Sequence, residues 1–138
     1  MTGEFPNEKE IKDFKEDMFK RGQLTAEEEK LIKSFPKTMH PMTQLSAGVL
    51  MCQPNSKFAK AYQDGIHPSK YWEPTLDDAI DLCAKVSNIA AIIYHNCYGD
   101  NNNIPSPDPN LDYGANYANM LGFTDEEFWE LLRLYIVI

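Results

Sequence analysis

The amino-acid sequence predicts an all-α, multi-helical fold built round a long central helix near residues 75–98. Apolar residues recur at spacings of three and four along most of the chain, as they do on one face of a helix. Residues that cap helix starts precede several of these runs, and the period-two alternation typical of strands is almost absent. The length of 138 residues is suited to a single domain.

Two capping boxes predict the first two helices. Each box pairs an N-cap side chain with a glutamate three residues later, and the pairs are Asn7 with Glu10 and Thr25 with Glu28. The first helix should cover residues 8–21 and end at Gly22, and the second should be short because Pro36 cannot continue it. Their apolar faces consist of Ile11, Phe14 and Met18, and of Leu31, Ile32 and Phe35.

A third helix is predicted from Pro41, which suits a first helical turn, towards Pro54. Its middle contains Ser46-Ala47-Gly48, and small residues there would allow another helix backbone to approach closely. The glycine costs about 1 kcal/mol of helix propensity. Phe58, Ala59 and Tyr62 then indicate one more short helix before Gly65.

The central helix begins at Thr75 in this interpretation and keeps helical spacing of apolar residues as far as Cys97. Because its apolar residues cover more than half of the circumference, we expect neighbours on several sides. Asp77, Asp78 and Asp81 near its start are interpreted as favourable partners of the helix dipole rather than as an acidic site.

A loop rich in turn formers follows over residues 99–109. Asp112 should cap a helix that Gly122 ends, and Thr124 to Glu127 reads as a capping box for the last helix. That helix runs to Ile138 without a polar or glycine stop, so we expect the natural polypeptide to continue beyond it. The opening residues likewise resemble an interior loop and carry neither a secretory nor a transit signal.

Composition excludes several classes of partner. The net charge of −8 is opposite to the basic footprint of a nucleic-acid-binding protein. No stretch reaches the roughly 20 apolar residues that a membrane span needs. Cys52, Cys83 and Cys97 lie within apolar patterns, which predicts buried thiols in a reducing compartment rather than a disulfide framework.

Chemical motifs are scarce. His40, His67 and His95 lie far apart, and none has the spacing of a metal-binding pair. The chain contains no glycine-rich phosphate loop and no GxSxG string. We therefore expect no catalytic, cofactor-binding or metal-ligating residue within residues 1–138.

Four ordered blocks resemble mitochondrial-type citrate synthases. The strongest is FPKTMHPMTQLSA over residues 35–47, and a TGEFP string over residues 2–6 is similar to a family loop. The other blocks are FAKAY with GIH and KYWE between residues 58 and 73, NLD with NMLGFTD between 110 and 125, and ELLRLY over 130–135. The resemblance therefore extends over essentially the whole chain.

The resemblance implies a partial large domain of a homodimeric enzyme that condenses acetyl-CoA with oxaloacetate in the mitochondrial matrix. The family's catalytic half and N-terminal elements would be absent, so the isolated chain should bind no cofactor and be inactive. Helices near residues 25–34 and 41–52 would form the dimer contact, where Gly48 would allow a close crossing. His40 would cap or pack, and Pro68 replaces a basic residue that contacts CoA in animal enzymes.

Two alternatives remain open at this point. A catalytically dead helical scaffold would explain the missing catalytic half. A fragment of 2-methylcitrate synthase would share the chemistry and differ only in pocket residues that lie elsewhere.

Overall fold

The computed structural model describes residues 5–100 and 103–137, and within them every regular element is helical. The short elements η1 and η2 are single turns of 3-10 helix. The elements in chain order are α1 (Glu8–Gly22), α2 (Ala26–Lys33), α3 (Pro41–Leu50), η1 (Gln53–Asn55), α4 (Lys57–Gln63), η2 (Pro68–Lys70), α5 (Trp72–Tyr98), α6 (Tyr113–Leu121) and α7 (Glu126–Val137). The all-α prediction is confirmed.

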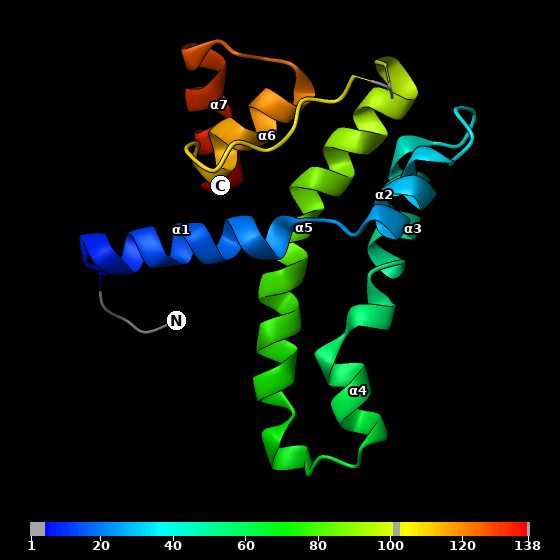
Figure 1. Ribbon diagram of the computed structural model, residues 1–138, viewed down its shortest axis with the longest axis vertical. Helices are drawn as coiled ribbons and strands as arrows, with labels where there is room; N and C mark the ends of the chain where they lie inside the picture. Colours follow the sequence, from blue (N-terminus) through cyan, green and yellow to red (C-terminus); the bar gives the residue numbers. More distant parts are fainter. Residues whose placement is uncertain (1–4, 101–102, 138) are drawn as a thin grey trace.

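The central helix α5 organises the molecule, and the other elements attach to it at different heights (Figure 1). We call residues 84–98 its upper half and residues 72–83 its lower half. The helices α2, α3 and α6 pack beside the upper half, and α1 crosses α5 near its middle. The lower half has α4 alongside it, and α7 reaches the rest of the molecule mainly through α6.

Helix starts follow the predicted caps with one exception. Both capping boxes form, and Asp112 accepts a hydrogen bond from the amide of Ala115 at 3.0 Å. The exception is α7, where Asp125 rather than Thr124 caps the helix by accepting from the Phe128 amide at 3.3 Å. Because the helix begins at Glu126, the residue three places after the cap is Phe128, which cannot complete a box.

The central helix begins three residues earlier than predicted, at Trp72 rather than Thr75. Pro74 is compatible with this earlier start, because a proline is tolerated in the first turn of a helix, where its missing N–H would have no partner. The structure also adds η2, a turn that no apolar period in the sequence marked.

A core of isoleucines joins α2, α3 and the upper half of α5. Ile32, Ile89, Ile92 and Ile93 form this cluster, and Leu24, Phe35, Leu45, Cys52, Cys97 and Ile104 pack against it. A Cβ at Gly48 would lie 2.8 Å from Cγ2 of Ile89, so the glycine permits α3 to touch α5. The close crossing predicted for a dimer contact is therefore an intrachain contact.

Burial along α5 is uneven, which corrects two expectations. Eight residues between Ala84 and Asn96 are buried, whereas none in the lower half is. The expectation of neighbours on several sides holds only for the upper half. All three cysteines are free thiols, but Cys83 is exposed because it lies on the lower half, while Cys52 and Cys97 are half-buried.

Three sequence expectations involve residues outside the described ranges. The TGEFP resemblance begins at Thr2, the loop predicted over residues 99–109 includes 101–102, and the predicted last helix ends at Ile138. The described part of α7 ends at Val137.

Candidate functional site

The most charged cluster of the described residues joins α1, α4 and α5. Arg21 contacts Asp17 at 2.6 Å, Asp77 at 2.6 Å and Asp81 at 2.5 Å. Lys57 lies 2.7 Å from Asp77 and 3.2 Å from Asp81. Hydrogen bonds from Asp77, then Asp81 and Asp17, raise the pKa of Arg21. We call these residues the arginine cluster.

The neighbouring Asp78 caps α4 from outside that helix. Its carboxylate accepts from the amides of Lys57 at 2.8 Å and Phe58 at 3.0 Å, and from the Ser56 hydroxyl at 2.6 Å. Burial acts to raise the pKa of Asp78, but these three donors and the charge of Lys57 outweigh burial and hold the pKa below its ordinary value. The three aspartates thus serve neighbouring elements, and Glu73 is the acidic residue in the first turn of α5. Their interpretation as dipole partners is wrong.

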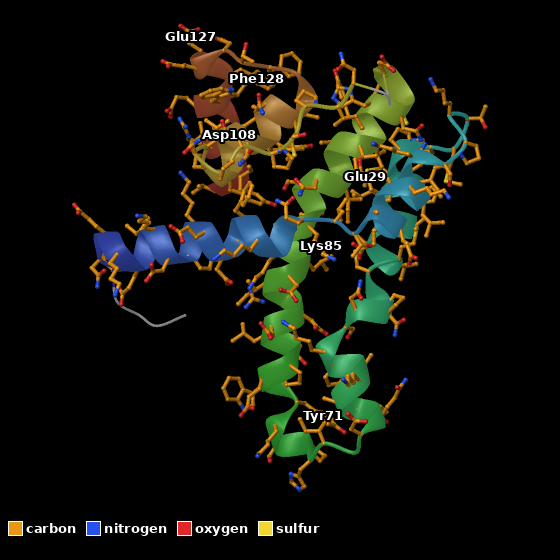
Figure 2. The ribbon with its side chains drawn as sticks, in the orientation of Figure 1. Glu29, Tyr71, Lys85, Asp108, Glu127 and Phe128 are labelled. Carbon is orange, nitrogen blue, oxygen red and sulfur yellow. The ribbon has the colours of Figure 1, made fainter. Side chains whose placement is uncertain are left out.

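A buried ion pair connects α2 to α5. Lys85 lies 2.9 Å from Glu28, with side-chain exposures of 13% and 7%. Figure 2 shows Lys85 at the level of α5 where α2 approaches. Burial acts to raise the pKa of Glu28, but the Thr25 amide, Lys85 and Asn55 together hold it below its ordinary value. The Glu28 carboxylate therefore completes the capping box of α2 and also bonds α2 to α5 and η1.

A buried amide pair fixes the connection before α3. Asn96 donates to the Gln44 side-chain oxygen at 2.8 Å and to the Phe35 carbonyl at 3.0 Å. Gln44 in turn donates to the carbonyl of Met39 at 2.8 Å and to Sγ of Cys97 at 3.2 Å. Both amides are almost fully buried, so this network fixes the segment that leads into α3.

Each histidine has a local structural role. His40 accepts from the Met42 amide at 3.2 Å and caps α3, which confirms the capping role expected for it. His67 accepts from the Ser69 amide at 3.3 Å and caps η2. His95 is buried, and its Nε2 lies 2.8 Å from the Met120 carbonyl of α6. No three His, Cys, Asp or Glu side chains of residues 5–100 and 103–137 gather closely enough to hold a metal ion.

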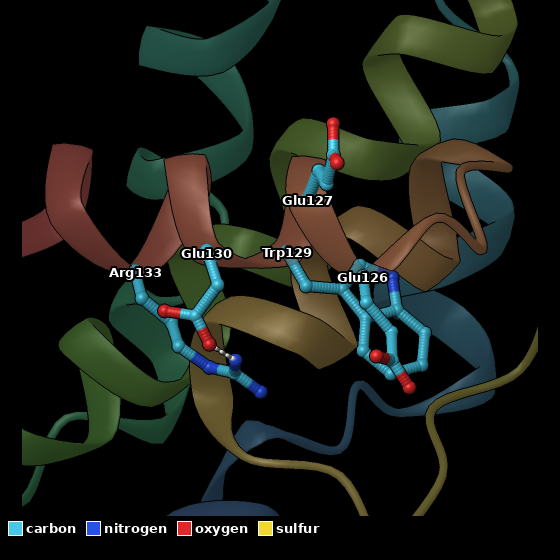
Figure 3. Close-up of a pocket in the computed structure, with 5 residues that line it drawn as sticks. All are labelled: Glu126, Glu127, Trp129, Glu130 and Arg133. Carbon is cyan, nitrogen blue, oxygen red and sulfur yellow. Dashed lines mark hydrogen bonds and ion pairs between the residues drawn. The ribbon is translucent and has the colours of Figure 1, made fainter.

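Two hollows on the described surface were considered as sites, and neither presents a catalytic set. Figure 3 shows the first, which lies on α7 and is lined by Glu126, Glu127, Trp129, Glu130 and Arg133. Arg133 there pairs with Glu130 and, at 2.6 Å, with Asp112. The second lies between the α1–α2 connection and the segment before α6, and both apolar residues such as Leu24 and Ile92 and polar residues such as Asn88 line it.

Exposed apolar side chains are the remaining candidate for function. The predicted dimer helices expose Leu31 (52%), Met42 (62%) and Leu50 (73%). Helix α7 buries none of its residues and exposes Leu131, Leu134, Tyr135, Ile136 and Val137. Such surfaces in one molecule indicate contact with another polypeptide segment. Within the described ranges, no helix is both long and apolar enough to cross a lipid bilayer.

Comparisons with known proteins agree on one family. The family model described as "Citrate synthase, C-terminal domain" matches residues 1–138. Over 138 residues the chain is 44% identical to "Citrate synthase 4, mitochondrial" of Arabidopsis thaliana. It is 42% identical to "Probable citrate synthase, mitochondrial" of Glossina morsitans morsitans and 41% identical to "Citrate synthase, mitochondrial" of Kajikia audax.

The match covers all of this chain but only 29%, 30% and 29% of those three relatives. Among solved structures, citrate synthase from Pyrobaculum aerophilum is similar with a TM-score of 0.71 and 26% identity. That similarity covers 86% of this chain and 30% of the other. The chain therefore spans slightly under a third of the relatives that it matches.

Proposed function

This chain belongs to the citrate synthase family, and we propose that it forms part of the large helical domain of an enzyme that joins acetyl-CoA to oxaloacetate, giving citrate and CoA. The observation that carries this proposal is the match over the whole chain, at 44% identity to the Arabidopsis relative. No observation favours the dead scaffold or 2-methylcitrate synthase over this function. The names of the three relatives support a mitochondrial location.

The role of this part is to provide a scaffold, and residues 1–138 contribute no catalytic, cofactor-binding or metal-ligating side chain. The charged clusters support this role, because Arg21, Lys57 and Lys85 are bound to carboxylates of the same chain. Acetyl-CoA is a substrate of the whole enzyme, and the groups that act on it lie in the part of the relatives that this chain does not span.

The enzyme is a homodimer in this proposal, with helices near residues 25–34 and 41–52 in its interface. Exposed Leu31, Met42 and Leu50 on α2 and α3 support that placement. Full burial of an exposed apolar side chain contributes roughly 1.5–3 kcal/mol, and these side chains, which are already partly covered, would contribute somewhat less each. A change of Leu50 to Glu should therefore weaken the dimer without disturbing the intrachain core.

A chimera tests the function. Residues 1–138 replace the matching segment of the Arabidopsis relative, and CoA release from acetyl-CoA and oxaloacetate is measured with a thiol reagent. We expect activity within about tenfold of the parent and none from the isolated chain. A folded, dimeric chimera without activity would contradict the proposal, as would turnover by the isolated chain that survives repurification.

The chimera also tests the effect of Pro68, which stands where the resemblance places a basic residue that contacts CoA. Pro68 begins η2 and offers no charge for a phosphate group. Pro68→Arg should lower the KM for acetyl-CoA with little change in kcat, because a charged contact would be added to binding alone. Pro68→Ala is the matched control, since it removes the proline without adding a charge.

A further inference from the structure

The segment between α5 and α6 contains Ser106-Pro107, the single place in the sequence where a proline follows a serine or a threonine. Residues 103–108 form no helix, and we call residues 103–109 the proline strap (Figure 1). Prolines occupy positions 105, 107 and 109, so the strap has few backbone N–H groups for a helix or a sheet. An enzyme can therefore bind this backbone in a groove without unfolding a helix.

The strap is fixed at its two ends and held weakly in its middle. The buried Asn116 of α6 accepts from the Asp108 amide at 2.8 Å and donates to the Asp108 carbonyl at 2.6 Å. At the other end, Ile104 packs against the isoleucine cluster. Between them, Asn119 donates to the Ser106 carbonyl at 3.5 Å, which is at the long limit of a hydrogen bond. Ser106 is therefore the part of the strap that leaves the surface most easily.

The Ser106 side chain is available for modification. The residue is exposed, and within residues 5–100 and 103–137 its hydroxyl makes no hydrogen bond. Other hydroxyls already have structural roles, as Thr25 caps α2 and Ser56 caps α4. Thr38 is also exposed and lies outside the helices, but Met39 follows it instead of a proline. Thr38 is therefore an internal control for the role of the proline.

We propose that Ser106 is a phosphorylation site for a kinase that selects proline after the acceptor hydroxyl. Any other residue there would place an N–H without a partner in the apolar pocket of such a kinase, whereas proline has no N–H. The Ser106 oxygen attacks the γ-phosphorus of ATP, the bond from that phosphorus to the β–γ bridging oxygen breaks, and ADP leaves with the electron pair. A carboxylate of the kinase accepts the hydroxyl proton. This inference goes beyond the proposed function and needs no turnover by the enzyme.

A phosphate on Ser106 acts on the strap through its charge. Ser106 and Glu29 line the same hollow, and Asp108 lies two residues further along the strap. A phosphoserine carries about −1.5 to −2 charges at pH 7, so both carboxylates repel it. Lys33, which lies 2.5 Å from Glu29, offsets part of this repulsion. We expect the middle of the strap to loosen and to uncover Ile92 in the hollow.

Phosphorylation of the folded chimera tests the site, because the chimera surrounds residues 1–138 with the rest of the enzyme. The protein is incubated with ATP and a purified mitogen-activated protein kinase, which is proline-directed, and phosphopeptides are identified by mass spectrometry. We expect phosphate on Ser106 and about tenfold less on Thr38. Pro107→Ala should slow the modification of Ser106 about tenfold, because the alanine N–H stays unpaired in the kinase. Pro105→Ala is the matched control, since it removes a strap proline but keeps the one after Ser106, and it should leave the rate nearly unchanged.

Hydrogen exchange measures the effect of the phosphate on the strap. Residues 104–109 have backbone amide hydrogens only at Ile104, Ser106 and Asp108, so exchange in this segment reports the strap alone. Phosphorylation should speed this exchange about tenfold, and Glu29→Gln should reduce the acceleration because it removes one of the two repelling charges.

Three results would overturn the inference. They are a folded chimera that takes up no phosphate at Ser106, equal rates for the two proline variants, and equal phosphorylation of Thr38 and Ser106. A synthetic peptide over residues 103–112 that is phosphorylated when the chimera is not would show that another part of the enzyme covers the strap, and the inference fails. A phosphorylated but inactive chimera keeps the inference while the proposed function fails, and an active chimera without phosphate does the reverse.

Discussion

Leu82 and Ile89 lie seven residues apart on one face of α5, and their surroundings differ completely. Ile89 is fully buried against α3, whereas Leu82 is 38% exposed on the lower half of the helix. Sequence periodicity treats the two residues alike, since seven residues are about two helical turns. Their difference shows that one helix can supply the core of a chain at one end and an exposed apolar surface at the other.

The two halves of α5 are also stabilised by different forces. The upper half is packed in an apolar cluster with Ile32 and is crossed by the buried Glu28–Lys85 pair. The lower half is held to α1 and α4 by the arginine cluster and by the cap from Asp78. Exposed ion pairs contribute at most about 1 kcal/mol each, so the lower half should be the less stable region.

The largest expected effect is the loss of a side chain from the upper half. Ile89→Ala removes a fully buried residue at the contact with α3 and should lower the free energy of unfolding by about 2–5 kcal/mol. Urea denaturation followed by circular dichroism measures this change. Ile89→Val is the graded control and should cost about 0.5–1.5 kcal/mol. Equal effects of the two substitutions would show that α3 does not pack on Ile89.

The second prediction concerns the ion pair in the upper half. Lys85→Met leaves the Glu28 carboxylate buried without its cation and should destabilise the fold by about 3 kcal/mol. The double variant with Glu28→Gln should recover much of that loss, because the amide oxygen can still accept from Thr25 and no unpaired charge remains. Urea denaturation of the wild type, both single variants and the double variant forms a double-mutant cycle, which measures the free energy of interaction between the two side chains. A double variant less stable than Lys85→Met would contradict this account.

Much of the fold could be predicted because its signals are local. Capping boxes at Asn7 and Thr25, the cap at Asp112 and the stop at Gly122 depend on residues a few places apart. The early start of α5 was missed because its first residues, Trp72 to Pro74, precede the regular apolar spacing from which the helix was predicted.

The partners of charged and small residues could not be predicted, because they come from distant parts of the chain. Asp77 lies 56 residues from Arg21, and Gly48 touches Ile89 rather than a second molecule. The exposure of Cys83 follows from which side of α5 lacks a neighbour, and an apolar pattern alone cannot show that. Cys97, in the upper half, is half-buried and met the expectation more closely because Gln44 of α3 lies beside it.

The third prediction concerns the pH at which the two halves of α5 lose their packing. The pKa of Asp77 is lowered by hydrogen bonds from Lys57 and then Arg21, and the pKa of Asp78 is lowered as described above. A carboxyl with a lowered pKa stabilises the fold fully above its unfolded pKa of about 3.9, and this contribution is lost as the pH falls from there through the lower pKa of the folded state. As the pH is lowered below about 4, we expect α4 to detach from the lower half before the core unfolds.

Backbone NMR shifts of α4 residues, followed against pH, measure this detachment. Asp78→Asn should weaken the pH dependence, because the amide cannot gain a proton in this range, although it accepts from the same amides less strongly. If α4 and the isoleucine cluster lose their native shifts at the same pH, the two halves form one cooperative unit and the comparison fails.

The smallest expected effect on the single chain is that of Leu82→Ala, the counterpart of the change at Ile89. Leu82 is already 38% exposed, and alanine is the better helix former, so the monomer should lose less than about 1 kcal/mol. Urea denaturation followed by circular dichroism measures this change under the same conditions as for Ile89→Ala. A loss as large as that of Ile89→Ala would mean that Leu82 belongs to the core, as Ile89 does, and that the two halves of α5 do not differ in packing.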